Sequence, residues 1–466
     1  MKLLLIRPGK LEDRAKNKLY AAASSPPLGL LYVAASLEEE GHKAEIIDFY
    51  VDELAEEKTL KILNSVDAVG ISVYTENMKD AKNISKKIKE IKPNIPIIIG
   101  GPHCIYLQKK SLMDIPYSDI VVGCEGERVI KDIARWLEGK KELANIPGIH
   151  FRYNGMIKKG KPHEIISDLD SIAFPARHTV YKYEYGDLGG WGHIYKKKVT
   201  AILSSRGCPF NCRFCARYGN VIKGWGYRQR SAENVVEELQ TLDGKYRSVY
   251  IADDNFLVDI RRAHKIFDMI LDIGLDFDFY IAGARVESAD LKLYKKMKKA
   301  GVKFIGFGIE SGNQDVLDFY NKEITLSQIR KAVSYAKKVG FIVYSTFIFG
   351  APIETKKHLE KTIDFACSLP LDIALFTPLR YEMGSALWLK AVKDNIISKN
   401  DLYTPADSNR NLGILSRDEI LKYVVKSHKR FYYRPRYIVN QFFKTLARGD
   451  LNMVLHGLSL QSRFLK

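Results

Sequence analysis

The feature that most constrains the fold is an alternation of short apolar runs with amphipathic segments, which begins at the amino terminus and is repeated later in the chain. Continuous Ile and Val runs that end in glycine are typical of parallel strands buried on both faces of a sheet. The first 140 residues therefore predict a doubly wound, Rossmann-like α/β sheet. Its strands are expected at 2–8, 43–49, 67–74, 95–101 and 119–126, and its helices at 28–42, 53–64 and 77–92.

The second alternation starts near residue 199. Before it, residues 144–170 predict a hairpin that turns at Asn154 and Gly155, and 171–197 predict a connector. Six strand–helix units with parallel strands indicate a partial (βα)6, TIM-like barrel, with its chemistry on loops at the carboxyl ends of the strands. We expect strands near 199–204, 247–252, 278–283, 303–308, 342–348 and 371–377, and helices near 231–242, 260–272, 288–300, 326–339 and 355–368.

The net charge is distributed unevenly along the chain. The formal net charge is +18, yet residues 1–150 hold 22 basic and 22 acidic side chains, so the excess lies in the rest of the chain. Residues 416–466 alone hold 11 basic and 3 acidic side chains. These shifts predict four parts: a front domain at 1–143, a hairpin and connector at 144–194, a barrel core at 195–400 and a basic helical region at 401–466.

Targeting signals are not evident. No run approaches the roughly 18–20 apolar residues that span a membrane, and the apolar stretch in "MKLLLIRPGK" is too short for a secretory signal. We therefore expect a cytoplasmic protein. In that reducing compartment, clustered cysteines indicate metal binding or catalysis rather than disulfides.

Three of the six cysteines, Cys208, Cys212 and Cys215, lie within eight residues in the first loop of the predicted barrel. A structural zinc site needs four ligands, usually in two separated pairs, and the sequence offers no second Cys-x-x-Cys or His pair. A cubane iron–sulfur cluster held by three thiolates leaves one iron open for a further ligand. We therefore expect the three thiolates to bind a 4Fe–4S cluster.

The spacing of these cysteines, with Phe214 before the last one, resembles the signature of the radical S-adenosylmethionine (SAM) superfamily. The resemblance extends over 195–385 through "IADDNF" (251–256), "AGARVES" (282–288), "GFGIESGNQDVL" (306–317) and "FIFGAPIET" (347–355). It implies that SAM binds the open iron and that one electron cleaves it to a 5′-deoxyadenosyl radical. Helix capping is the alternative interpretation of the acidic positions. The cofactor-binding residues that the resemblance implies are Phe214, Asp253, Asp254, Arg285, Glu310 and Ser311.

The front domain, from "SSPPLGLLYVAASLEEEGHKAEIIDFY" (24–50) to its later strand ends, resembles the cobalamin-binding domain of cobalamin-dependent radical SAM enzymes. It lacks the Asp-x-His-x-x-Gly motif that supplies a lower axial His, so we expect cobalamin without a His below the cobalt. A front domain that no longer binds cobalamin is the alternative. The residues expected around cobalamin are Pro27, Gly29, Ser72, Tyr74, Gly100, Gly101, His103, Glu125 and Gly126.

Together, the resemblances imply a class B-like methyltransferase. Its radical would abstract hydrogen from an unactivated carbon, and methylcobalamin would then donate a methyl group to that carbon. Radical cyclisation, coupling or oxidation without net methyl transfer begins with the same abstraction and stays open. A non-catalytic cobalamin or redox sensor is a third hypothesis.

The basic segment "KSHKRFYYRPRYIVNQFFKTLARG" (426–449) has three interpretations: helices packed on the barrel, docking on an anionic membrane surface, or nucleic-acid binding. The tRNA-modifying methylthiotransferases share the radical core but carry three cluster-binding cysteines in their front domain. Here that domain has only Cys104 and Cys124, which disfavours nucleic acid. The expected partners are an organic substrate, either lipid-like or a peptide segment of a protein, and a reducing protein such as ferredoxin or flavodoxin.

Overall fold

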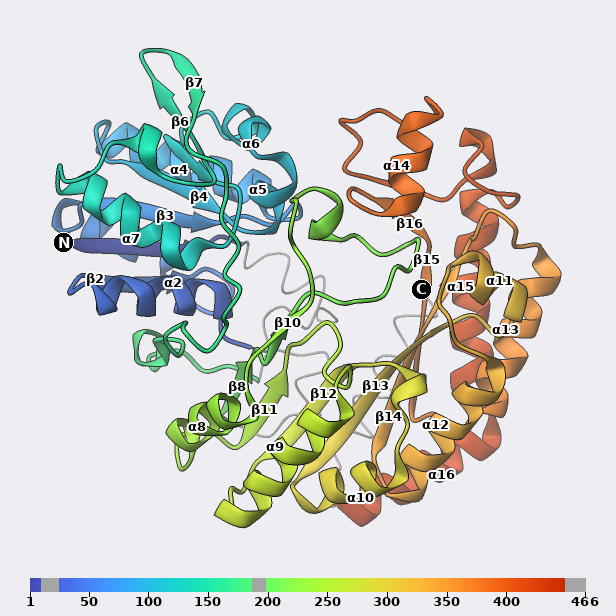
Figure 1. The fold of residues 1–466 in the computed structure, drawn as a ribbon. Coiled ribbons are helices and arrows are strands. Elements are labelled where there is room, and N and C mark those ends of the chain that lie inside the picture. Colours follow the sequence, from blue (N-terminus) through green and yellow to red (C-terminus); the bar gives the residue numbers. More distant parts are fainter. Residues whose placement is uncertain (10–24, 187–197, 449–466) are drawn as a thin grey trace. The chain divides into compact units, whose positions relative to one another are not determined.

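The computed structural model describes residues 1–9, 25–186 and 198–448, and only the backbone of 445–448. The chain forms two compact units (Figure 1): Met1–Ile202 with Tyr218–Asn234, and Leu203–Arg217 with Val235–Lys466. In the described ranges, no helix is long and apolar enough to cross a membrane. The four-part division expected from composition stays a prediction.

The first unit is built on a seven-stranded sheet. This sheet contains β1 (Lys2–Arg7), β2 (Lys43–Asp48), β3 (Ala68–Ser72), β4 (Ile97–Gly100), β5 (Ile120–Val122), β6 (Ile149–Tyr153) and β7 (Met156–Lys159). The strand order is β2-β1-β3-β4-β5-β6-β7, with β1 to β5 parallel and the last two antiparallel. The predicted doubly wound sheet is confirmed, and its five parallel strands lie where the apolar runs placed them.

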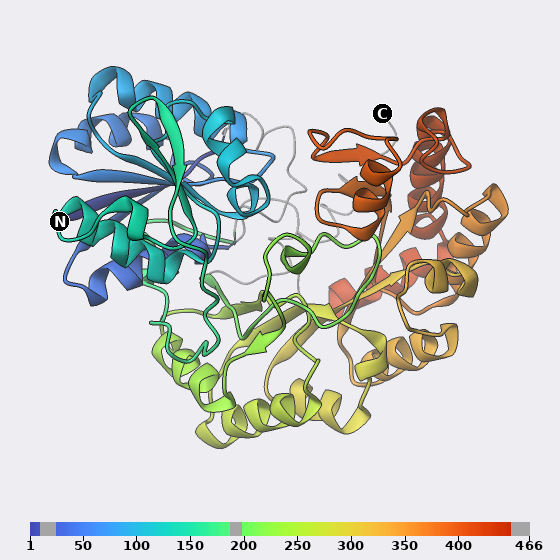
Figure 2. The ribbon, with the colours of Figure 1, turned by 45° about the horizontal axis from the view of Figure 1, so that its top comes forward.

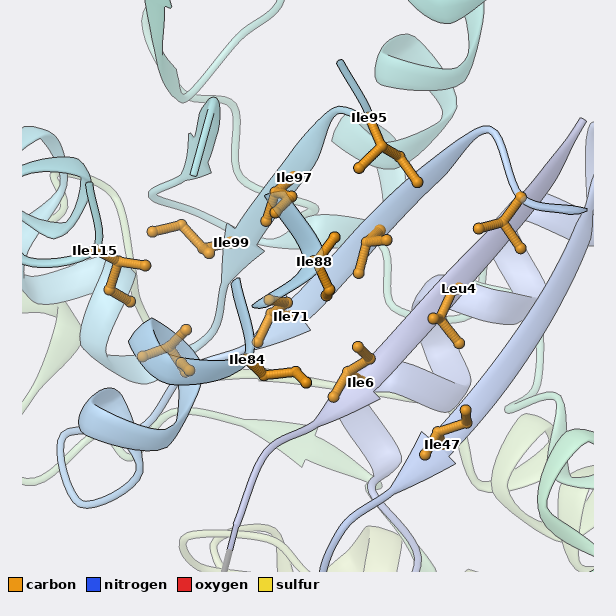
Figure 3. Close-up of a cluster of buried hydrophobic side chains, with 14 of the residues drawn as sticks. Leu4, Ile6, Ile47, Ile71, Ile84, Ile88, Ile95, Ile97, Ile99 and Ile115 are labelled. Atoms are coloured by element: carbon orange, nitrogen blue, oxygen red, sulfur yellow. The ribbon is translucent and has the colours of Figure 1, made fainter. Parts of the chain in front are cut away.

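Helices cover both faces of this sheet because neighbouring residues of a strand point to opposite sides. Leu4 and Ile6 of β1 face a core that includes Ile84 and Ile88 of one helix (Figure 3), whereas Leu5 faces a different core. Fully burying each such side chain contributes about 1.5–3 kcal/mol. The helices are α2 (Leu28–Glu39), α3 (Ala55–Ile62), α4 (Met78–Ile91), α5 (Pro102–Leu107), α6 (Lys109–Asp114) and α7 (Gly126–Leu137).

The hairpin between β6 and β7 turns where the sequence predicts. Asn154 and Gly155 both have positive φ, at 50° and 75°, as a two-residue hairpin turn of type I′ requires. The connector then returns to the end of β2. Tyr183 donates a hydrogen bond to Asp52 over 2.9 Å, and Tyr185 donates one to Asp48 over 3.0 Å. The last part of the predicted connector, 187–197, lies outside the described residues.

The second unit contains a parallel sheet whose successive strands are joined by helices (Figure 2). The strand β8 (Val199–Ile202) precedes this unit in the chain. The order β15-β14-β13-β12-β11 is that of consecutive βα units, so the predicted barrel-type α/β fold is confirmed. The strands are β11 (Ser248–Ile251), β12 (Asp278–Ala284), β13 (Val302–Glu310), β14 (Ile342–Phe349) and β15 (Ile373–Pro378).

The helices of this unit bury the outward-facing side chains of the strands. Phe279 of β12, for example, packs edge-to-face on Phe267, with ring centroids 6.2 Å apart. The helices predicted from periodicity are α8 (Ala232–Leu242), which spans the boundary between the units, α9 (Ile260–Ile273), α10 (Leu291–Lys299), α12 (Leu326–Lys338) and α13 (Lys356–Ser368).

The sequence analysis missed several short elements. In the second unit these are the two-residue strand β9 (Ser205–Arg206), α11 (Gln314–Phe319), β16 (Arg380–Glu382), α14 (Ala386–Lys393) and β17 (Tyr403–Pro405). In the first unit they are α5, α6 and the two-residue strand β10 (Arg228–Gln229), and none of these short elements is long enough to show a clear hydrophobic period. The analysis also missed the longer helix α7, which has 12 residues.

The basic carboxyl-terminal region forms α15 (Arg417–Tyr432) and α16 (Pro435–Arg448). His428 and Phe431 of α15 pack edge-to-face on Phe376 of β15. On the same helix, Arg430 pairs with Glu360 and Asp364 of α13. The interpretation as helices packed on the barrel is therefore confirmed for α15. Residues 449–466, the end of the basic segment, lie outside the described residues.

Candidate functional site

The three clustered cysteines lie in the loop that opens the second unit. Burial raises the pKa of the Cys208 thiol, and the charges of Asp254 and Cys212 raise it further. Cys215 lies within electrostatic reach of the other two sulfurs. Among the described residues, no three Cys, His, Asp or Glu side chains are placed to hold a metal ion. Three thiolates that hold a cubane cluster each bind a different iron, so they need not converge on one point.

This loop, residues 204–217, is held by two elements that the sequence analysis missed. The amide of Arg213 donates to the carbonyl of Tyr320 over 2.8 Å, just after α11. The amide of Leu387, in α14, donates to the carbonyl of Arg213 over 3.0 Å. The amide of Arg217 donates to the carbonyl of Gly384 over 3.3 Å. Backbone hydrogen bonds to two different segments therefore shape the loop.

Asp253 follows β11, and its carboxylate is hydrogen-bonded to other residues of the protein. Its carboxylate accepts hydrogen bonds from the amide and hydroxyl of Ser204 and from the hydroxyl of Ser205, all at 2.6 Å. Burial raises the pKa of Asp253, although these hydrogen bonds and Arg262 oppose the shift. The carboxylate therefore fixes the start of the cysteine loop. The capping interpretation is wrong, because Asp259 caps α9.

The neighbouring Asp254 differs from Asp253 in being exposed to solvent. Its charge reaches both Cys208 and Cys215. Gly283 of β12 makes this turn possible, because a Cβ at Gly283 would lie 2.3 Å from the carbonyl oxygen of Asp253. Of the two predicted acidic residues, only Asp254 presents its side chain toward solvent beside the thiols.

Glu310 ends β13 with a backbone conformation that is rare for glutamate, at φ 68°. Its Oε1 lies 3.0 Å from Lys322 Nζ, and its Oε2 accepts a hydrogen bond from Thr346 over 3.2 Å. The next residue, Ser311, is fully buried, and its hydroxyl lies 3.2 Å from that of Thr362 on α13. The capping interpretation is wrong here too, because Asn313 is the N-cap of α11 and no side chain caps that helix.

Arg285, after β12, joins the cysteine loop to the Lys322 segment. Its Nη1 donates to Cys212 Sγ over 3.5 Å, and its guanidinium lies 3.7 Å from the ring centroid of Phe210. Its Nη2 donates to the carbonyl of Lys322. Phe214, in the same loop, packs edge-to-face on Tyr320 with centroids 5.0 Å apart. Arg285 thus contacts the predicted cluster loop, and Phe214 packs that loop against Tyr320.

Three buried polar atoms near these strand ends have no hydrogen-bond partner in the described part of the chain: Tyr320 Oη, Asn255 Oδ1 and Glu354 Oε1. Burial raises the pKa of Glu354 to about 7, although its Oε2 accepts hydrogen bonds from the amides of Gly350 and Ala351. Unpartnered buried atoms of this kind indicate sites for water or ligand atoms. Together with the thiols and the Glu310 carboxylate, they fit a site for a cluster and a polar cofactor.

The first unit presents a different kind of edge at the carboxyl ends of its strands. Gly100 ends β4, and Gly101 has φ 105° and ψ −176°, a conformation restricted to glycine. A Cβ at Gly101 would lie 2.9 Å from the carbonyl oxygen of Val73. Ser72 ends β3, and Tyr74 is half-exposed beyond it. Backbone and small groups at this edge fit a large planar ligand such as cobalamin.

Three further predicted residues lie at helix starts in the first unit. Pro27 precedes α2, and Gly29 lies within that helix, where an added Cβ would meet no atom within 4 Å, so packing does not require glycine there. His103, in α5, is 1% exposed. Its Nδ1 lies 3.3 Å from the Thr75 hydroxyl, and burial lowers its pKa. The ring is therefore buried and neutral.

The last two predicted cobalamin residues have internal packing roles. The Glu125 carboxylate accepts a hydrogen bond from the Ile166 amide over 2.9 Å and pairs with Arg228 Nη1 at 2.8 Å. Gly126 begins α7, where a Cβ would lie 3.3 Å from Val33 on α2. Glu125 therefore secures the connector, and Gly126 allows the two helices to approach.

The sequence analysis missed Lys322, Thr346, Arg228 and the serines Ser204 and Ser205. A buried lysine or arginine has no distinctive sequence pattern, because its burial depends on partners far along the chain. The two serines offered a weak signal, since they directly follow a predicted strand and precede the cysteines.

Comparison with known proteins agrees with this geometry. The Radical SAM superfamily model matches residues 202–366, and the B12 binding domain model matches 19–134. The chain is 33% identical over 450 residues, 95% of both chains, to "Uncharacterized methyltransferase PH0819" of Pyrococcus horikoshii. It is 26% identical to the cytidylyl-2-hydroxyethylphosphonate methyltransferase of Streptomyces wedmorensis, covering 80% of this chain and 79% of that one.

Two solved structures have the same fold. OxsB, a cobalamin-dependent SAM radical enzyme solved with aqua-cobalamin and SAM bound, matches with a TM-score of 0.74 at 18% identity, over 98% of this chain and 72% of that one. The methyltransferase TsrM of Kitasatospora setae, with cobalamin and a [4Fe-4S] cluster bound, matches with a TM-score of 0.66 at 18% identity, over 84% and 75%. The chain therefore belongs to the cobalamin-dependent radical SAM methyltransferase family, whose members use a 4Fe–4S cluster, SAM, cobalamin, an organic substrate and a reductant.

Proposed function

We propose that this chain methylates an unactivated carbon of an organic substrate. The observation that carries the proposal is the cysteine loop, whose three thiols share one electrostatic environment with Arg285 in a chain that also has a B12-binding unit. When bound, the cluster and SAM supply hydrogen abstraction, and cobalamin supplies the methyl group. The chain itself holds and orients these groups and excludes water.

Cys208, Cys212 and Cys215 would bind the cluster. Arg285, by donating to Cys212 Sγ, would orient that ligand. The raised pKa of Cys208 means that this thiol is protonated in the free chain, so cluster assembly would release a proton there.

The SAM site would lie beside this loop. Glu310 and Asp254 would supply carboxylates, and Phe214, which packs on Tyr320, would form part of the wall. Asp253 and Ser311 would act indirectly, because their polar atoms are already bonded to Ser204, Ser205 and Thr362.

Cobalamin would bind at the carboxyl edge of the first sheet. Six of the nine predicted residues suit direct contact with it: Pro27, Gly29, Ser72, Tyr74, Gly100 and Gly101. We propose no His ligand below the cobalt. The ring of His103 is 1% exposed, which supports that proposal.

Substrate and location belong to the same proposal. We favour a lipid-like substrate over a peptide. The reductant would be ferredoxin or flavodoxin, and the enzyme would be cytoplasmic and dock on an anionic membrane surface. Supporting this, α16 carries no acidic residue and has an exposed Arg436. Four of its apolar side chains are 45–63% exposed: Ile438, Val439, Phe442 and Phe443.

Sedimentation with vesicles tests the docking. The chain should sediment with vesicles rich in phosphatidylglycerol and less with pure phosphatidylcholine, and Phe442→Ser/Phe443→Ser should abolish the difference. Leu271→Ser, at an exposed apolar position on α9, is the control. Equal sedimentation by the wild type and the double variant would contradict the docking.

A second candidate function is radical cyclisation. The chain is 26% identical to the anaerobic magnesium-protoporphyrin IX monomethyl ester cyclase of Cereibacter sphaeroides, over 93% of this chain and 70% of that one. The similarity to this relative extends over both units of the chain. The same architecture therefore also supports a proposal of chemistry without methyl transfer.

Isotope labelling separates the two functions. The reconstituted enzyme would be incubated anaerobically with SAM deuterated in its methyl group, dithionite and a lipid extract, and the products analysed by mass spectrometry. A product that carries the deuterated methyl group is expected. Formation of 5′-deoxyadenosine with only unlabelled, hydrogen-depleted products would favour cyclisation or oxidation.

A further inference from the structure

Lys322 is a lysine that no motif marks, yet it is only 6% exposed. Lysine is almost never this buried unless it is paired. Its partner is Glu310, itself 5% exposed, and the two side chains meet at 3.0 Å. The pair joins the end of β13 to the loop between α11 and α12.

The surroundings leave little freedom to this pair. Glu310 has positive φ, and such a conformation persists in a non-glycine residue only where neighbouring groups enforce it. Thr346 fixes the second carboxylate oxygen. A Cβ at Gly308 would lie 2.3 Å from Glu310 Oε1 and 3.0 Å from Lys322 Nζ, so glycine leaves the room that the ion pair needs.

Lys322 also contacts the surroundings of the cysteine loop. Its carbonyl accepts a hydrogen bond from Arg285, whose Nη1 donates to Cys212 Sγ over 3.5 Å. Its Nζ lies 5.6 Å from the ring centroid of Phe214, the residue before Cys215. Its backbone neighbours Tyr320 and Asn321 bond to the loop itself, Asn321 Nδ2 donating to the Asn211 carbonyl over 3.3 Å.

We propose that Lys322 is a positioning residue that holds the Glu310 carboxylate and the cysteine loop in one arrangement. The ammonium group fixes the carboxylate, and the two residues before Lys322, Tyr320 through its carbonyl and Asn321 through its side chain, hold the loop. One short segment thereby sets the distance between the acidic group of the SAM site and the thiols. This inference rests on the proposed function only in that Glu310 contributes to SAM binding.

The test is Lys322→Met in the full chain, reconstituted anaerobically. Iron per chain, the dissociation constant for SAM by equilibrium dialysis, and the electron paramagnetic resonance spectrum of the reduced cluster with and without SAM would be measured. We expect iron content near wild type, SAM binding weakened about tenfold or more, and a smaller SAM-induced spectral change. Lys322→Arg should restore most of both SAM effects, because it keeps the charge.

Lys303→Met is the matched control. Lys303 lies on β13, at the opposite end of that strand from Glu310, where it pairs with Asp278 of β12, and its side chain is 42% exposed. This variant should leave SAM binding and the spectrum unchanged. Unchanged SAM affinity and an unchanged SAM-induced spectrum in Lys322→Met, with normal iron, would overturn the inference.

If Lys322→Met assembles no cluster, Lys322→Gln decides, because it removes the ammonium charge that pairs with Glu310 but keeps a polar side chain at the buried position. Weakened SAM binding with intact iron supports positioning of the carboxylate, and unchanged binding overturns it. A wild-type chain without cobalt or methyl transfer would sink the proposed methylation but would leave this SAM measurement valid.

Discussion

The candidate cofactor sites of the two units are built from different kinds of residue. In the second unit, charged side chains near the strand ends are fixed by polar partners, as Glu310 is by Lys322 and Asp253 is by Ser204. In the first unit, the expected contact positions are mostly uncharged, and Gly101 shapes the edge through its backbone. In the proposed sites, side-chain charge would organise the thiolates and a polar nucleoside cofactor, whereas small residues would leave space for a planar macrocycle.

The largest expected effect is the loss of iron binding without the loss of cobalt binding. Replacing Cys208, Cys212 and Cys215 together by Ala should abolish iron binding and leave cobalt binding intact, because no other cysteine lies in the loop. Metal analysis after reconstitution with hydroxocobalamin measures both. Cys104→Ala, in the first unit, is the control and should keep both metals. Retained iron in the triple variant would break the comparison.

The converse effect is expected at Gly101. Gly101→Ala forces alanine into a conformation restricted to glycine, at a cost of about 1–3 kcal/mol. The free chain should relieve this strain by shifting the end of β4, so cobalamin binding has to restore the strained conformation. Cobalamin affinity should therefore fall roughly tenfold, since each 1.4 kcal/mol is tenfold in an equilibrium constant, and iron should stay unchanged. Gly41→Ala is the control, because Gly41 also has positive φ (78°) but lies at the far end of α2, away from the expected cobalamin site. Equal cobalamin affinity in the wild type and Gly101→Ala would remove Gly101 from the site.

Glu354 tests the cost of burying charge in the second unit. Its folded-state pKa, about 7, lies above the ordinary 4.5, so the favourable contribution of its protonated form is complete below pH 4.5 and is lost as the pH rises to about 7. Glu354→Gln stays neutral, and its stability relative to wild type should therefore increase across that window by roughly 3 kcal/mol. Urea midpoints at pH 5 and pH 7.5 measure the change. A constant difference between the two proteins at both pH values would refute this account.

The smallest expected effect sharpens the description of the first unit. Gly29→Ala should stabilise the cobalt-free chain by about 0.5–1 kcal/mol, because glycine weakens a helix and the added methyl group meets nothing within 4 Å. The same methyl group should weaken cobalamin binding if that space belongs to the site. Thermal unfolding and cobalamin titration give the two values. Increased stability with unchanged cobalamin affinity would place Gly29 outside the site.

Much of the fold could be predicted because its strands are buried on both faces and therefore read as continuous apolar runs. The runs at 67–74 and 95–101, for example, became β3 and β4 within a few residues. Short elements such as α11 could not be predicted, since one and a half turns show no period. They matter nonetheless, because the residues after α11 hold the cysteine loop.

The candidate site was predictable where chemistry fixes spacing and unpredictable where long-range packing decides. The cysteine triad is local, so the sequence reveals it. The use of the Asp253 carboxylate by Ser204 and Ser205, or of Glu125 by Arg228, depends on residues about 50 to 100 positions apart. No local pattern distinguishes such an internally bonded carboxylate from one that faces a cofactor.

The most direct test of the central claim is a count of iron and cobalt in the intact chain after anaerobic reconstitution with iron, sulfide and hydroxocobalamin. Two separate sites in one chain predict about four iron atoms, as one cubane requires, and about one cobalt per chain. Iron without cobalt would contradict the account, because it would leave the radical chemistry in the second unit and remove the methyl carrier from the first.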